Sequence, residues 1–100
     1  MATRPRNIDD ITATLRSLLP ELRERWGVQR IGVFGSWVRG EQSSASDLDI
    51  LVEFDKPTFD DYMETKFYLE EYFGVNVDLV LADTVKTRIK PQIEREAVYA

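Results

Sequence analysis

The sequence has 100 residues, of which 43% are hydrophobic and 31% charged, with a net charge of −5 and neither cysteine nor histidine. These numbers predict one packed domain over residues 1–100, and they exclude disulfides, thiolate zinc sites, histidine ligands and serine–histidine catalytic pairs. No apolar run is long enough to cross a bilayer, so we expect a cytoplasmic protein without membrane association. Acidic residues dominate between Glu41 and Asp83, which argues against direct binding to nucleic acid.

The N-terminal part of the chain predicts a helix, a strand and a tight turn. Asn7 can cap a helix that ends at Gly27, because apolar residues recur between them at helical spacing. Proline cannot donate the helical hydrogen bond, so Pro20 predicts that this helix is broken or restarted there. A short buried strand is expected at 28–34, followed by one helical turn at 36–40.

The remaining residues predict two further strands and two helices. The strands are expected at 47–54 and 75–81, and the helices run from Thr58 to about Phe73 and over 84–99, with an interruption or restart at Pro91. Several large side chains fall at helical spacing and are expected in the core: Trp26, Phe59, Met63, Phe67 and Phe73. This order favours an α/β or α+β fold with one small mixed β-sheet and flanking helices.

The turn Gly35-Ser36 and the pair Asp47 and Asp49 are the residues that point to chemistry. A Gly-Ser turn after a strand exposes backbone N–H groups and a hydroxyl, which can hold phosphate. Carboxylates at positions i and i+2 of a strand point to one face and can share a hard cation such as Mg²⁺. The alternative is a solvated strand face, although two like charges repel unless a cation lies between them. The pattern predicts metal-assisted phosphoryl or nucleotidyl transfer.

Four further residues are candidates for the same site. If the strand of Asp78 lies beside that of Asp47, three carboxylates can hold two Mg²⁺ ions, and Asp78 can accept a proton from an attacking hydroxyl. The alternative for Asp78 is a surface position on an edge strand. Arg39 either reaches a phosphate or stays a solvated charge, and Ser46 is a candidate nucleotide contact. Trp37 is expected to resist burial on the short turn and to stack near the nucleotide or contact an acceptor protein.

The motif Gly35-Ser36, Asp47-Leu48-Asp49 and Asp78 closely resembles the nucleotidyltransferase superfamily that includes DNA polymerase beta. The segments 34–40, 46–52 and 95–99 look like its minimal single-domain branch, the MNT proteins. The resemblance implies that Gly35 and Ser36 hold the nucleotide phosphates and that Asp47 and Asp49 bind two Mg²⁺ ions. It also implies that Asp78 completes the shell of the catalytic ion, while a hydroxyl attacks the α-phosphate of ATP and expels pyrophosphate.

MNT proteins of this size resemble antitoxins that are paired with a small helical HEPN ribonuclease toxin. The resemblance implies an adenylyltransferase that neutralises its partner by transferring AMP to a tyrosine of the toxin. One alternative is a non-catalytic antitoxin that acts by binding alone. Another is a small-molecule nucleotidyltransferase that works with a separate acceptor-binding subunit.

Overall fold

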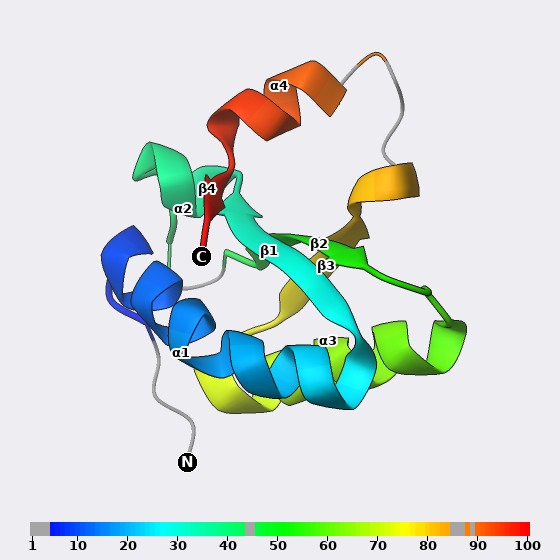
Figure 1. Cartoon of the computed structure of the whole chain (residues 1–100). Helices are drawn as coiled ribbons and strands as arrows, with labels where there is room; N and C mark the ends of the chain where they lie inside the picture. The colour runs from blue at the N-terminus through cyan, green and yellow to red at the C-terminus, as the bar shows by residue number, and fades with distance from the viewer. Residues whose placement is uncertain (1–4, 44–45, 85–87, 89) are drawn as a thin grey trace.

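A computed structural model describes residues 5–43, 46–84, 88 and 90–100. Its four strands form one sheet in the order β3-β2-β1-β4, in which β1 pairs antiparallel with β2 and β4, and β2 lies parallel to β3. The helices α1 and α3 lie on one side of the sheet and α4 on the other (Figure 1). The predicted small mixed sheet with flanking helices is confirmed. In chain order the elements are α1 (Ile8–Trp26), β1 (Val28–Phe34), α2 (Ser36–Arg39), β2 (Leu48–Phe54), α3 (Phe59–Phe73), β3 (Val77–Leu81), η1 (Ala82–Thr84), α4 (Lys90–Glu96) and β4 (Val98–Tyr99).

Within the described residues, no helix combines the length and the apolar character that crossing a membrane requires.

Helix α1 begins and ends as the sequence predicts, but it is not interrupted. The side chain of Asn7 accepts a hydrogen bond from the backbone N–H of Asp10 (3.0 Å), and Gly27 ends the helix in the left-handed conformation at φ 75°. The expected break at Pro20 is wrong, because the helix runs through this residue. Pro20 lies on the exposed side, where water can solvate the carbonyl that loses its helical partner.

Helix α3 buries a different side from the one expected. Thr58 caps it, and its buried residues are Thr65, Leu69 and Phe73. Phe59 and Phe67 are 75% and 54% exposed, so their predicted core positions are wrong, whereas that of Phe73 is confirmed. Both series of residues recur every four positions, so helical spacing alone does not decide which series faces the sheet.

The C-terminal tail differs from the single interrupted helix that was expected. Helix α4 does start next to Pro91, but it is followed by β4, which pairs with the edge of β1. Gly32 permits this pairing, because a Cβ at that position would lie 2.9 Å from Cδ1 of Tyr99. The rest of the expected helix, at 85–87 and 89, lies outside the described residues. Helical periodicity cannot show that a strand edge elsewhere in the chain is open for pairing.

Candidate active site

The turn after β1 has a backbone conformation that requires glycine. Gly35 adopts φ 81° and ψ −151°, and its carbonyl accepts the first hydrogen bonds of α2, from the backbone N–H groups of Val38 and Arg39. A Cβ on Gly35 would lie 2.1 Å from Oδ2 of Asp49. The phosphate-binding turn predicted from the sequence is therefore in direct contact with one of the predicted carboxylates.

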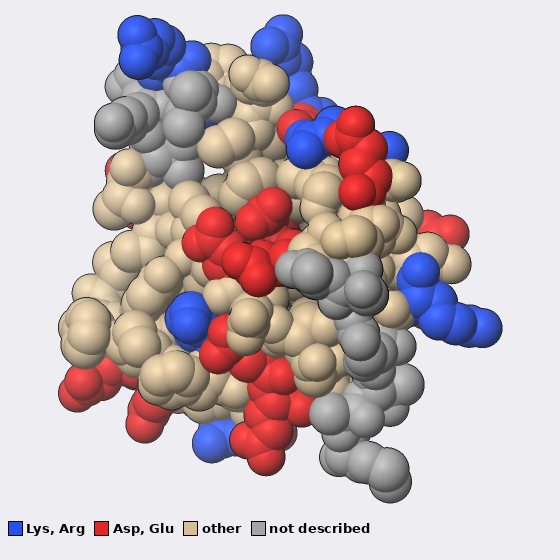
Figure 2. All heavy atoms as spheres, turned by 180° about the vertical axis from the view of Figure 1, so that it is seen from behind, with Lys and Arg blue, Asp and Glu red and all other residues tan. Residues whose placement is uncertain are grey.

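The sheet register brings the carboxylates together. Asp49 on β2 pairs with Phe34, the last residue of β1, and with Asp78 on β3. The condition that the strand of Asp78 lies beside that of Asp47 is met, although β2 begins at Leu48, one residue after Asp47. The alternative holds as well, because β3 is an edge strand and Asp78 is exposed. Acidic side chains gather near the centre of the face seen in Figure 2.

Asp49 has an unusual electrostatic environment. Burial raises the pKa of its carboxyl to about 6, and the charges of Asp78 and Asp47 and a hydrogen bond with Asp78 act in the same direction. The positive charge of Arg39 opposes this increase. A carboxylate with this pKa is destabilised when ionised, and a bound cation would stabilise it.

The donor set fits a hard divalent cation, although the described residues do not form a finished metal site. Among them, no group of three or more histidine, cysteine or acidic side chains is arranged to hold a metal ion as it stands. Asp49 and Asp78 are adjacent in register, and Asp47 is near enough to raise the pKa of Asp49. Carboxylate oxygens of this kind are the ligands that Mg²⁺ prefers.

Glu96 is a member of the site that sequence reasoning did not single out. Its Oε1 accepts hydrogen bonds from the backbone N–H of Gly35 (2.8 Å) and from Nη1 of Arg39 (2.6 Å). Arg39 also donates from Nε to Glu41. The segment 95–99 contributed to the family resemblance, but no spacing rule connects position 96 with a turn 61 residues earlier.

The remaining predicted site residues differ in their surroundings. Ser36 opens α2 beside Gly35, and the hydroxyl of Ser46 accepts a hydrogen bond from the backbone N–H of Ser43 (2.8 Å). Trp37 is only 5% exposed and belongs to the hydrophobic core. The expectation that Trp37 resists burial is wrong, because the short helix α2 turns this ring into the hydrophobic core.

Comparison with known proteins gives the family. The protein-family model described as nucleotidyltransferase domain matches residues 15–100 of this sequence. The chain belongs to the nucleotidyltransferase family. This nucleotidyltransferase is 45% identical over 93 residues to the protein adenylyltransferase MntA of Thermococcus cleftensis, covering 92% of this chain and 94% of the relative.

Solved structures agree with this assignment. A minimal nucleotidyltransferase is 38% identical and superposes with a TM-score of 0.78, covering 92% of this chain and 94% of its own. The MNT antitoxin in complex with the tri-AMPylated HEPN toxin of Shewanella oneidensis gives a TM-score of 0.63 at 21% identity, covering 88% of this chain and 66% of its own. The second likeness concerns the fold alone.

Proposed function

We propose that this nucleotidyltransferase transfers AMP from ATP to a hydroxyl of a partner protein and acts as an antitoxin. The observation that carries the proposal is the contact of the Gly35 turn with Asp49, which is itself paired in register with Asp78. This arrangement puts a phosphate-binding turn directly beside a cluster of carboxylates. The name of the Thermococcus relative and the AMPylated toxin of the Shewanella complex support a protein acceptor.

The acceptor in this proposal is a tyrosine of a cognate HEPN-like toxin. AMP adds negative charge and bulk to the modified hydroxyl, and a ribonuclease must accept the phosphates of RNA. Modification near the ribonuclease site would therefore reduce RNA binding. Because the donor is ATP, we place the reaction in the cytoplasm.

The roles proposed for the residues follow from their positions. The turn at Gly35 and Ser36 binds the phosphates, with the hydroxyl of Ser36 as a donor while Glu96 accepts the backbone N–H of Gly35. The guanidinium of Arg39 adds positive charge beside the phosphates. The three aspartates would hold Mg²⁺, expected as two ions, which would offset the negative charge of the phosphates and make the attacking hydroxyl more acidic. The hydroxyl oxygen forms a bond to the α-phosphorus, the bond to the β-phosphate oxygen breaks, and pyrophosphate leaves. Asp78 is positioned to accept the hydroxyl proton.

The test is transfer of label from ATP to a protein, with the purified chain, Mg²⁺ and a co-expressed partner toxin. We expect label from ATP carrying α-³²P, and none from γ-³²P, on one partner band. Asp47→Asn and Asp49→Asn should each reduce labelling by at least ~100-fold, because each removes a carboxylate from the centre. Asp60→Asn, which changes an exposed acid at the start of α3, should label as the parent does. Full labelling by both site variants would contradict the proposal.

The same variants separate the alternatives. If Asp47→Asn and Asp49→Asn do not transfer AMP but still neutralise the partner, binding alone is sufficient for the antitoxin role. The complex formed by the Shewanella antitoxin is the observation that favours this second candidate. Label that appears on a soluble alcohol, with none on protein, would instead indicate a small-molecule nucleotidyltransferase.

A further inference from the structure

We infer that Glu96 is a positioning residue for nucleotide binding, which fixes the Gly35 turn and orients Arg39 toward the phosphates. The inference rests on the proposed binding of nucleotide phosphates at this turn. It does not depend on which acceptor receives AMP. Glu96 acts on the reaction through Gly35 and Arg39 and does not need to touch the nucleotide itself.

One carboxylate oxygen of Glu96 connects the Gly35 turn with Arg39. The backbone N–H of Gly35 and Nη1 of Arg39 both donate to Oε1, at 2.8 Å and 2.6 Å. Hydrogen bonds to an ionised acceptor are stronger than those between neutral groups. The side chain of Glu96 is 19% exposed, compared with 63% for Glu41, the other acid that pairs with Arg39. The bond to Glu96 is therefore less screened by water than the bond to Glu41.

The pairing of β4 with β1 brings the end of α4 close to the Gly35 turn. β1 and β4 pair antiparallel at Gly32↔Tyr99 and Val33↔Val98. Glu96 is the last residue of α4, two positions before β4 begins, and Gly35 directly follows β1. The backbone N–H of Ala100 also donates to the carbonyl of Ile31 (2.9 Å), so β4 is anchored beyond its last residue. The place of Glu96 is thus set by main-chain pairing.

Glu96 and Asp49 contact different atoms of Gly35. Oδ2 of Asp49 lies against the Cα of Gly35, and Glu96 accepts a hydrogen bond from the backbone N–H of Gly35. The turn therefore contacts two acids. Asp49 pairs in register with Asp78, and Glu96 forms an ion pair with Arg39. Without Glu96, the Gly35 N–H would lose its partner and the turn could shift relative to Asp49.

Arg39 keeps donors for a nucleotide while Glu96 holds it. Among the described residues, its guanidinium donates from Nε to Glu41 and from Nη1 to Glu96. A guanidinium has five N–H groups in a fixed plane, so Nη2 remains for a phosphate oxygen. The Arg39 side chain is 51% exposed, so a ligand in solution can reach it.

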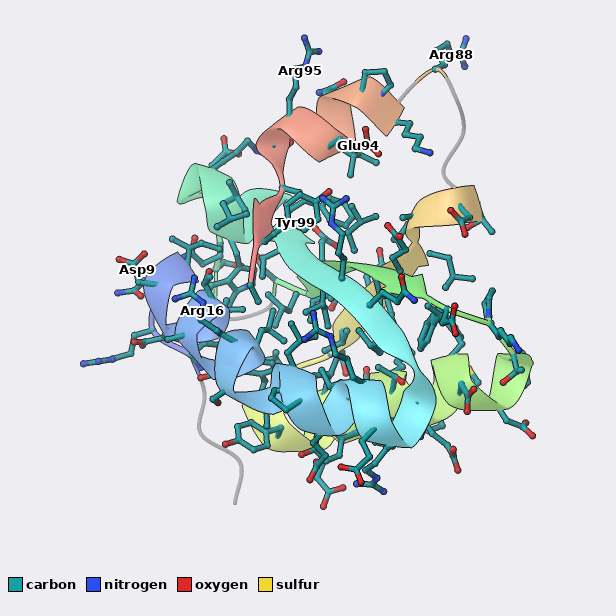
Figure 3. The ribbon with its side chains drawn as sticks, in the orientation of Figure 1. Asp9, Arg16, Arg88, Glu94, Arg95 and Tyr99 are labelled. Carbon is teal, nitrogen blue, oxygen red and sulfur yellow. The ribbon has the colours of Figure 1, made fainter. Side chains whose placement is uncertain are left out.

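The experiment measures binding of the analogue AMP-PNP with Mg²⁺ by calorimetry, together with KM for ATP and kcat for AMP transfer. Glu96→Ala should weaken AMP-PNP binding and raise KM by about 10- to 100-fold, with a smaller effect on kcat. Glu96→Gln keeps an acceptor oxygen at the same reach and should restore most of the affinity. Glu94→Ala removes an acid of the same short helix, labelled in Figure 3, and should bind as the parent does.

A purely structural role predicts a different result. The melting temperature of each variant is recorded, and binding is measured well below it. Unchanged affinity of Glu96→Ala would overturn the inference, even if the variant is less stable. Tighter binding would also overturn it, since Glu96 would then occupy a phosphate position. If Glu96→Ala does not fold, Glu96→Asp replaces it: the shorter acid should bind more weakly than Glu96→Gln, and equal affinities would refute the role.

The same measurements separate this inference from the proposed function. If the parent binds AMP-PNP but transfers no label to protein, the adenylyltransferase role is refuted. The effect of Glu96 on binding is still decided by the affinities of its variants for AMP-PNP. If the parent does not bind AMP-PNP, the positioning role of Glu96 is refuted together with the nucleotide site.

Discussion

The carboxyl of Asp49 is stabilised in its protonated form by its position, and this has consequences for folding. Its pKa is raised to about 6, above the usual range of an aspartate, because the group is partly buried and lies near Asp78 and Asp47. Since the folded pKa is above the unfolded one, the penalty on folding develops as the pH rises between the two pKa values and is complete above about 6. Below the unfolded pKa the group is protonated in both states, and the penalty vanishes.

We therefore predict that Asp49→Asn stabilises the metal-free protein in a pH-dependent way. At pH 8, in the presence of EDTA, the free energy of unfolding should rise on the order of 1 kcal/mol. The gain should shrink as the pH falls through 6 and disappear near 4. Urea unfolding at several pH values measures this, with Asp60→Asn as the exposed control that gives no gain. A gain that does not change with pH would show that ionisation is not its cause.

A second prediction for single residues compares Gly35 and Gly40. Both have a positive φ, but they differ in the space that a Cβ atom would find. Gly35→Ala would drive a Cβ against Asp49, whereas a Cβ at Gly40 (φ 72°) meets nothing within 4 Å. Gly40→Ala should therefore cost only the strain of the left-handed backbone, about 1 kcal/mol. Gly35→Ala should cost about 1–3 kcal/mol more and abolish AMP-PNP binding. Equal losses in urea unfolding would mean that the contact with Asp49 is not what restricts the turn.

Helix α3 presents aromatic side chains to solvent, so substitutions along it should have very different effects. Phe67→Ser should change the free energy of unfolding by no more than about 0.5 kcal/mol, because the side chain is 54% exposed. Phe73→Ala should cost about 3–5 kcal/mol, because this side chain is 1% exposed and fills part of the core. Urea unfolding of the two variants checks the assignment of the buried side, and a large loss for Phe67→Ser would contradict it.

For the molecule as a whole, local patterns predict the elements and the carboxylates but not their tertiary partners. Asp49 and Asp78 can be identified because a strand alternates its side chains and because carboxylates are unusual inside apolar runs. Glu96 cannot be identified in this way, since its role depends on which strand edge β4 joins. The prediction for Trp37 is wrong for a similar reason. Whether a ring is buried depends on what packs around it, and the sequence of a four-residue helix does not show this.

We expect the contact of Gly35 with Glu96 to be among the last parts of the site to form. The two residues are 61 positions apart, and closing a loop of this length has an entropic cost that must be met before the contact contributes. Contacts between distant positions are also slow to form. A chain that has folded its N-terminal helix and first hairpin would still lack the support of its phosphate turn. Nucleotide binding should thus report completed folding, and a partly folded chain would hold no ATP.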